Sequence, residues 1–203
     1  MMKRLGILLP LLLCFLSADC LPAFAQMVSP LAGAARSEAI AAVQAANDVR
    51  TSLQFRFEME RHSPLLTGAL LSRGRAAFVF PDKLRWETES PRPGLFVLNG
   101  LSTADRRFQS LFRNIQKISE KGLINESDFT LTVYRTESGW QFDMVPQRRD
   151  LGQLFSLITL LTDAPSGTLR SIVLTGTDGD LTVLRLSDVI RGGRVDESLF
   201  QQP

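Results

Sequence analysis

The spacing of hydrophobic and polar residues changes along this chain, and each change predicts a new element. Between residues 31 and 50, small apolar residues such as Ala39 and Val43 recur at helical spacing. That spacing predicts a helix with a shallow, alanine-rich face that packs closely on something flat. From Leu53 the period becomes two, with Phe55 and its alternate neighbours apolar and the residues between them polar. This alternation predicts a strand with one apolar and one polar face.

Further strands follow, separated by one more helix. Gly68 and Gly74 in the second strand suggest bends or bulges, and Asn99-Gly100 is a tight-turn signal. A second helix over 105–121 ends at Gly122, a typical C-cap. The other strands are predicted at 66–80, 84–87, 95–98, 128–135, 139–146, 154–162, 169–175 and 180–187, with a last short strand holding Leu199 and Phe200.

The order of these elements is helix, strands, helix, strands. Consecutive strands joined by short turns form an antiparallel meander. About eight or more such strands in one curved sheet, with two helices that must bury apolar faces, predict an α+β fold. We expect an incomplete, unclosed antiparallel β-barrel with helices covering its concave face.

The N-terminus has the three parts of a secretory signal peptide. A basic start precedes an apolar run over residues 5–16, and Ala23-Phe24-Ala25 is a small-x-small cleavage pattern. We expect residues 1–25 to be a signal peptide that is cleaved after Ala25. Residues 26–203 then form a single domain that works outside the cytoplasm.

Two alternatives concern the same segment. An uncleaved anchor is disfavoured because the apolar run is shorter than the roughly 20 residues that span a bilayer. Lipid attachment at Cys20 is disfavoured because Asp19 stands where a small residue is preferred. If cleavage follows Ala25, both cysteines, Cys14 and Cys20, are removed, and the mature chain has no thiol for a disulfide, a nucleophile or a metal site.

Charge and candidate chemistry narrow the function. Without the predicted signal, 21 basic and 20 acidic residues remain, so we expect no nucleic-acid partner. The single histidine, His62, has no second histidine or thiol with which to bind a metal. The carboxylate pairs Glu58/Glu60 and Glu87/Glu89 fall on polar strand faces, where solvated charges are expected. No nucleophile elbow, phosphate loop or dinucleotide motif occurs, so we expect no catalytic residue, no cofactor and no enzymatic activity.

Large apolar side chains are the most prominent feature of the chain. It holds 13 phenylalanines and two tryptophans, many of them on predicted strands. They either fill an ordinary core or line a pocket that the sheet and helices leave open, and periodicity alone does not separate the two. Such a pocket would hold an alkyl chain by apolar contact alone, at about 0.8 kcal/mol per buried methylene.

Several short motifs occur in a fixed order through the mature chain. They are Phe57-x-Met59, Leu71-Ser72-Arg73-Gly74, Phe80-Pro81-Asp82-Lys83-Leu84-Arg85-Trp86-Glu87, Ser90-Pro91, Phe96-Val97-Leu98-Asn99-Gly100, Phe112-x-x-Ile115, Asp128-Phe129, Trp140 to Pro146, and Gly179-Asp180-Leu181-Thr182. This ordered set resembles the LolA family, the periplasmic carriers of outer-membrane lipoproteins, in its divergent branch with a Pro-Asp-Lys-Leu-Arg-Trp-Glu core.

The resemblance implies a hydrophobic cavity under a helical lid, in a protein of the periplasm. Carriers of this family take acylated lipoproteins from an inner-membrane ABC-type exporter and hand them to an outer-membrane acceptor, so it implies these partners. We expect a monomer. The positions that match the family's cavity and lid are Phe57, Leu84, Trp86, Leu111, Phe112 and Ile115.

Two departures from the family pattern concern the lid. Many relatives have glutamine where this chain has Met59, and many have arginine where it has Phe80. Because phenylalanine cannot donate hydrogen bonds to lid carbonyls, we expect the lid to be held by apolar contact or to stay partly open.

Taken together, pattern and resemblance predict a lipid-binding site and leave its cargo open. A sensing module on the same fold, or a carrier of another lipid such as a glycolipid or a pigment precursor, would have a similar sequence. The candidate ligand-binding residues of cavity and lid are Phe55, Phe57, Met59, Phe80, Leu84, Trp86, Phe96, Leu98, Leu111, Phe112, Ile115, Ile118, Phe142 and Met144.

Overall fold

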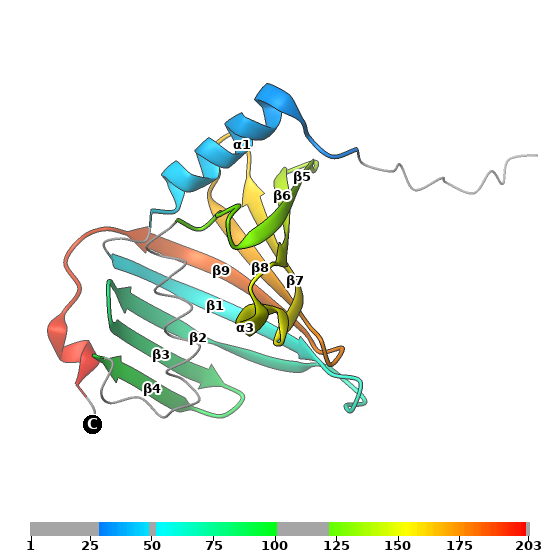
Figure 1. Cartoon of the computed structure of the whole chain (residues 1–203). Coiled ribbons are helices and arrows are strands. Elements are labelled where there is room, and N and C mark those ends of the chain that lie inside the picture. Colours follow the sequence, from blue (N-terminus) through cyan, green and yellow to red (C-terminus); the bar gives the residue numbers. More distant parts are fainter. Residues whose placement is uncertain (1–28, 49–51, 101–121, 202–203) are drawn as a thin grey trace, which may run out of the picture.

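A computed structural model describes residues 29–48, 52–100 and 122–201, and it places nine strands in one antiparallel sheet (Figure 1). The strand order is β4-β3-β2-β1-β9-β8-β7-β6-β5, so β4 and β5 are the edges and the described sheet is not closed. The expectation of an unclosed antiparallel sheet is therefore confirmed. The strands are β1 (Ser52–His62), β2 (Leu70–Val79), β3 (Lys83–Ser90), β4 (Gly94–Asn99), β5 (Phe129–Arg135), β6 (Gly139–Pro146), β7 (Phe155–Asp163), β8 (Leu169–Gly176) and β9 (Leu181–Arg191).

Two meanders meet at the centre of the sheet. Strands β1 to β4 pair in chain order, as do β5 to β9, and the pairing of β1 with β9 joins the two groups. In this central seam Phe57 lies opposite Leu186, and Met59 lies opposite Leu184. The middle of the sheet is thus built from the first and the last strand of the chain.

The register brings most of the large apolar residues of the nine strands to one face. Residues directly opposite each other on neighbouring strands share a face. Phe57 lies opposite Gly74, and further along the sheet Phe142 lies opposite both Val133 and Leu160. We call the side that carries Phe57, Trp86, Leu184, Leu160 and Phe142 the apolar face. The opposite side carries Glu58, Arg75, Glu87 and Arg185, and we call it the charged face.

Helix α1 (Gly33–Ala46) packs on the apolar face over β5, β6 and β7. Ala39 and Val43 are fully buried in one cluster with Val133 and Phe142. The short alanine side chains allow a close approach. A Cβ added to Gly167, in the turn between β7 and β8, would lie 2.5 Å from a backbone atom of the helix. The shallow, closely packed face predicted for this helix is what the structure shows.

Asn47 ties the C-terminal end of α1 to the sheet. Its amide nitrogen donates to the carbonyl oxygens of Val43 and Gly167, at 2.7 and 2.8 Å. Its oxygen accepts from the backbone amide of Leu169 and from the guanidinium of Arg191, at 3.0 and 2.8 Å. The side chain is buried and uses both its donors and both its acceptor positions, which fixes the helix end against β8 and β9.

The chain end departs from the predicted pattern. Leu199 and Phe200 lie in the short 3-10 helix η1 (Glu197–Phe200), whose start is capped by the side chain of Asp196. Phe200 is only 1% exposed and packs against Ala77. A single helical turn buries this aromatic ring without any strand partner, so the prediction of a last short strand was wrong.

Two further segments differ from the expected boundaries. The second strand begins at Leu70 rather than at 66, because residues 63–69 form the turn between β1 and β2. A short helix, α3 (Arg149–Gly152), joins β6 to β7 and places Leu151 in the main core.

A pair of helices covering the concave face is not shown. Helix α1 lies over one part of the apolar face, and the helix predicted over 105–121 lies outside the described residues. None of the described helices combines the length and the hydropathy needed to cross a membrane.

Candidate functional site

Three aromatic rings from β1 and β3 meet on the apolar face. Phe57 stacks on Trp86, with ring centroids 4.1 Å apart and an interplanar angle of 28°. Phe55 meets the edge of the same indole at 6.2 Å and 76°. Phe57 is 2% exposed, whereas Phe55 and Trp86 are only half-buried. We call these three residues the aromatic cluster. The ring of Phe57 is enclosed, whereas the rings of Phe55 and Trp86 present apolar surface.

Gly74 makes room for this cluster. It lies directly opposite Phe57 on β2, where the pairing with β3 shifts by one residue. A Cβ at this position would lie 1.9 Å from the carbonyl oxygen of Glu87 and 2.9 Å from Cζ of Phe57. The absence of a side chain therefore lets β3 approach closely and lets the Phe57 ring lie flat on the strand, and the predicted irregularity at Gly74 is confirmed.

A second group extends the apolar face toward the edge at β4. Phe78 and Leu98 are buried together, and Phe80, Leu84 and Phe96 pack against them. Leu84 lies opposite Leu98, and Trp86 opposite Phe96, so these residues continue the aromatic cluster across the strands. Phe80 therefore makes apolar contacts at this position.

Met59 lies on the apolar face between the aromatic cluster and the turn that joins β1 to β2. It is half-buried and lies between Ser72 of β2 and Leu184 of β9. The hydroxyl oxygen of Ser72 is buried and has no hydrogen-bond partner among the described residues. The surface is otherwise apolar at this point, as a path for a hydrocarbon chain requires.

The remaining predicted residues fall into two groups. Phe142 and Met144 lie on the same face but under α1, where they are 0% and 3% exposed, so a ligand meets them only if α1 moves. Leu111, Phe112, Ile115 and Ile118 lie outside the described residues. The structure thus brings Phe55, Phe57, Met59, Phe80, Leu84, Trp86, Phe96 and Leu98 onto one surface, and their role in binding remains a prediction.

The sequence reasoning missed the contribution of the C-terminal strands to this surface. Leu184 and Leu186 of β9 and Ile172 and Leu174 of β8 lie on the apolar face beside the aromatic cluster. Both strands are predicted, but their apolar residues alternate with valine and threonine. The pattern therefore does not show which side chains lie on the apolar face. The pairing of β9 with β1 supplies the missing information.

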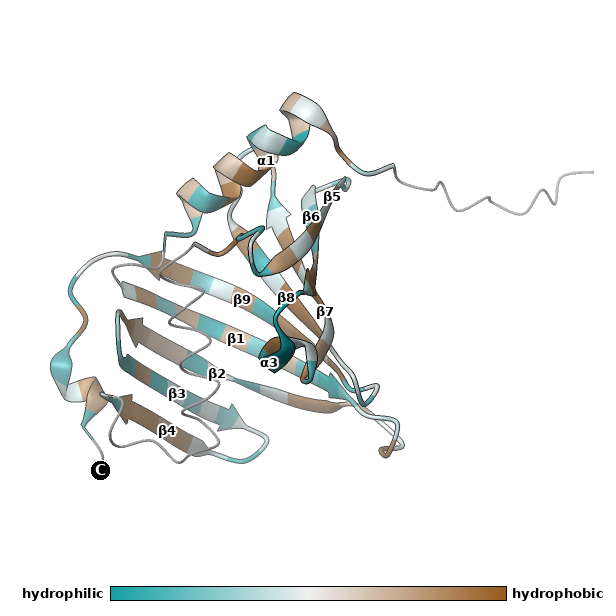
Figure 2. Ribbon diagram, in the orientation of Figure 1, coloured by the Kyte–Doolittle hydropathy of each residue, from teal (hydrophilic) through white to brown (hydrophobic). Residues whose placement is uncertain are grey.

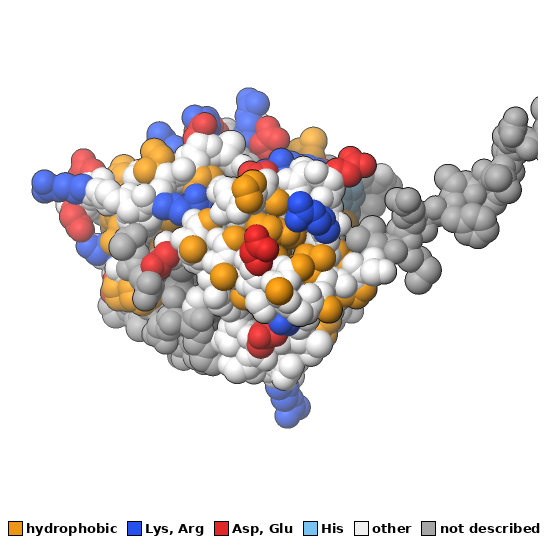
Figure 3. Space-filling view, turned by 90° about the horizontal axis from the view of Figure 1, so that it is seen from above, with side chains coloured by type: hydrophobic (Ala, Val, Ile, Leu, Met, Phe, Trp, Pro, Cys, Tyr) orange, Lys and Arg blue, Asp and Glu red, His pale blue; other side chains and the backbone are white. Residues whose placement is uncertain are grey.

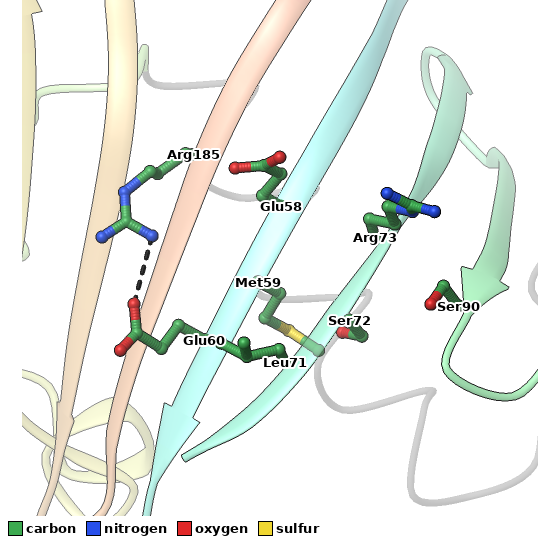
Figure 4. Close-up of a pocket in the computed structure, with 8 residues that line it drawn as sticks. All are labelled: Glu58, Met59, Glu60, Leu71, Ser72, Arg73, Ser90 and Arg185. Carbon is green, nitrogen blue, oxygen red and sulfur yellow. Dashed lines mark hydrogen bonds and ion pairs between the residues drawn. The ribbon is translucent and has the colours of Figure 1, made fainter.

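A shallow pocket of about 340 Å³ is lined mostly by residues of the charged face, together with Met59 and Ser72 (Figure 4). Its lining residues are Glu58, Met59, Glu60, Leu71, Ser72, Arg73, Ser90 and Arg185. Glu60 accepts a hydrogen bond from Arg185 at 3.2 Å, and its other carboxylate oxygen lies 2.8 Å from Nε2 of His62. The hydrogen bond from Arg185 holds the pKa of Glu60 below its usual range. An ionised, partnered carboxylate is a poor general acid or base at neutral pH, and we assign no chemistry to this pocket.

Other carboxylates of the charged face are also paired with arginines. Glu87 accepts from Arg75 at 2.9 Å and from Arg85 at 2.9 Å, which lowers its pKa. Arg56 pairs with Glu89 at 3.1 Å. On the side of the molecule above α1, basic and acidic side chains are interspersed among apolar ones (Figure 3). Within the described ranges no group of three or more potential metal ligands occurs.

No protein-family profile and no curated protein matches the chain, but solved structures do. One is a LolA superfamily protein from Nitrosomonas europaea, 11% identical, with a TM-score of 0.44 over 84% of this chain and 99% of that chain. The sequence resembles the same family. A chain of the MucA/MucB complex of Pseudomonas aeruginosa is 16% identical, with a TM-score of 0.47 over 84% of this chain and 62% of that chain.

Proposed function

We propose that this protein is a periplasmic carrier that binds the acyl chains of lipoproteins on its apolar face and moves them from the inner to the outer membrane. The observation that carries this proposal is the aromatic cluster. Phe55 and Trp86 expose part of their rings on the apolar face, beside the apolar side chains of β2, β3, β4 and β9. An acyl chain laid along this surface would shield those rings from water.

The proposed mechanism needs no catalytic group. Each methylene moved from water to an apolar surface contributes about 0.8 kcal/mol, so a lipid with two or three chains is held firmly without a single polar contact. Release requires an acceptor that binds the chains better, because the carrier has no energy source of its own. We therefore infer a binding protein rather than an enzyme.

Lipoprotein is the proposed cargo because of the signal peptide and the motifs shared with LolA carriers. Export would place the protein between an inner-membrane ABC-type exporter and an outer-membrane acceptor, which are its proposed partners. Phe80, where many relatives have arginine, packs against Phe78 and Leu98. An apolar contact at this point would replace the hydrogen bonds that fasten the lid in those relatives.

The two tryptophans allow a direct test, because only one lies in the proposed site. Trp86 is half-buried in the aromatic cluster, whereas Trp140 is 4% exposed in the core under α1. Trp140→Phe leaves Trp86 as the only reporter, and Trp86→Phe leaves Trp140. A fatty acid brominated in mid-chain should quench the fluorescence of the first variant strongly and that of the second weakly.

Potassium bromide at the same bromine concentration is the control for quenching from solvent. If the brominated chain quenches neither tryptophan, the carrier proposal fails. Equal quenching of both would place the chain away from the aromatic cluster. Mass spectrometry of protein purified gently from its native periplasm then identifies the cargo: triacylated lipoprotein supports the proposal, and glycolipid would make it a carrier of another lipid.

A further inference from the structure

We propose that the turn between β1 and β2 docks the protein on the surface of a phospholipid bilayer; this inference rests on the proposed carrier function. The turn and the first residues of β2 carry Leu65, Leu66, Leu70 and Leu71, which we call the tip leucines. They are 93%, 44%, 56% and 65% exposed. The hairpin projects at one end of the sheet, with hydrophobic residues at its extremity (Figure 2).

Two more apolar side chains are exposed at the same end of the sheet as the tip leucines. Leu154 and Val145, also exposed, lie at the same end of the sheet. The carbonyl of Leu154 accepts from the amide of Thr177 in the turn between β8 and β9. The same turn meets the hairpin, because a Cβ on Gly179 would lie 3.1 Å from Cγ of Pro64. Exposed apolar side chains gathered in this way mark an interaction surface.

The shape of the tip favours a bilayer over a protein groove. Leu70 lies opposite Arg61 and therefore on the apolar face, while Leu71 lies opposite Glu60 and on the charged face. Leu65, in the turn that precedes β2, is almost wholly exposed. A protein groove contacts a hairpin from one side, whereas the interior of a bilayer surrounds whatever enters it. A projection that is apolar on both sides is suited to the second case.

Arg61 and Glu60, the charged residues of β1 next to the tip, are both paired. Arg61 donates to Asp180 at 3.1 Å, and Glu60 is held by Arg185 and His62. Neighbouring charges that neutralise each other match a zwitterionic lipid surface better than an anionic one. We therefore expect docking that depends on apolar contact and changes little with salt.

Position connects the tip to the proposed site. Along the apolar face, Met59 lies between Phe57 and the tip, and Leu70 follows it on β2. A bilayer that receives the tip would therefore adjoin the end of the surface that holds the acyl chain. The chain could then pass between carrier and membrane without crossing water.

The test is flotation with phosphatidylcholine vesicles of the processed protein, whose N-terminus is verified by mass spectrometry. We expect the wild type to float at low and at high salt. The double variant Leu65→Glu/Leu71→Glu should lower the bound fraction about tenfold or more, because two charges would enter the apolar region. Ile190→Glu is the matched control, since Ile190 is 58% exposed near the far end of β9 and should float like the wild type.

Other outcomes overturn the inference. These are wild type that does not float, flotation that needs anionic lipid and disappears in salt, and an equal loss in Ile190→Glu. Self-association in the absence of vesicles that the tip variant abolishes would make the tip a dimer contact instead. The Trp86 quenching assay separates the two proposals: tip variants should keep full quenching, and wild type that floats without quenching would refute the carrier function alone.

Discussion

The apolar face is covered on β5, β6 and β7 but partly exposed on β1 and β3. Over β5, β6 and β7 the face is covered by α1, and Val133 and Phe142 are completely buried. On β1 and β3, Phe55 and Trp86 remain half-buried although they belong to the same continuous surface. The first region is a filled core that stabilises the fold, and the second leaves aromatic surface partly exposed, which the proposed acyl chain would cover. Two comparisons between the two regions test this difference, and two further predictions concern the end of α1 and the charged face.

The largest expected effect is the truncation of a phenylalanine in the covered region. Phe142→Ala should lower the free energy of unfolding by about 3–5 kcal/mol, because it leaves a cavity under α1. Phe55→Ala should cost less than half as much, because its ring is only half-buried, and it should weaken acyl-chain binding. Urea unfolding followed by circular dichroism measures the first quantity, and probe titration the second. Equal destabilisation by both variants would mean that the β1–β3 region is an ordinary core.

Two glycines provide the next comparison. Gly74→Ala and Gly139→Ala each place a Cβ within 2 Å of a carbonyl oxygen, of Glu87 and Thr162 respectively. Both should therefore destabilise by about 1–3 kcal/mol or more, as overpacking does. Only Gly74→Ala also displaces Phe57, so only this variant should reduce quenching of Trp86 by an acyl chain. Gly94→Ala is the control, because its Cβ meets nothing within 4 Å.

A smaller loss of stability is expected when Asn47, which ties α1 to the sheet, is replaced. Asn47→Ala removes four hydrogen bonds and leaves the Leu169 amide and the Arg191 guanidinium without that partner. We expect a loss of about 1–3 kcal/mol, together with faster hydrogen exchange in α1. Gln44→Ala, which removes one partly buried hydrogen bond to the Ile124 carbonyl, should cost less. Unchanged exchange in Asn47→Ala would show that packing alone fixes the helix.

The smallest effect concerns pH and the charged face. The pKa values of Glu60 and Glu87 lie below the ordinary 4.5 because each accepts hydrogen bonds from arginine. A carboxylate with a lowered pKa stabilises the folded state above its ordinary pKa, and this contribution is lost as the pH falls through the folded value. The urea midpoint should therefore stay flat from neutral pH to about 5 and decline below it. Glu87→Gln should reduce the decline, and high salt should weaken it further; a midpoint that falls between pH 7 and 6 would contradict this origin.

Local pattern was enough to predict most of the sheet. Alternation around Phe55 and the turn at Asn99-Gly100 placed β1 and β4 closely, since side-chain direction and turn chemistry are local properties. Helix α1 was predicted for the same reason. Phe200 was misassigned because a lone buried aromatic residue is compatible with any element that has a core beside it.

The candidate site could be predicted less well from the local sequence pattern. Phe55 and Phe142 both alternate with polar neighbours, yet one is half-buried and the other lies under α1. That distinction depends on where a helix from a different part of the chain is docked, and Asn47 fixes it through partners that lie far away in sequence. Exposure of the tip leucines was equally hidden, because the sequence pattern places Leu66, Leu70 and Leu71 inside a strand over 66–80.

The central pairing of β1 with β9 has a consequence for how the protein reaches its folded state. The two strands are separated by more than half of the chain, so the middle of the sheet has high contact order and cannot form until the last strand is present. A chain that emerges from a membrane with its N-terminus first would expose β1 to β4, with their aromatic residues, until β9 arrives. During that interval the unpaired edge of β1 can pair with other chains and promote aggregation, and this edge is protected only when β9 pairs with it.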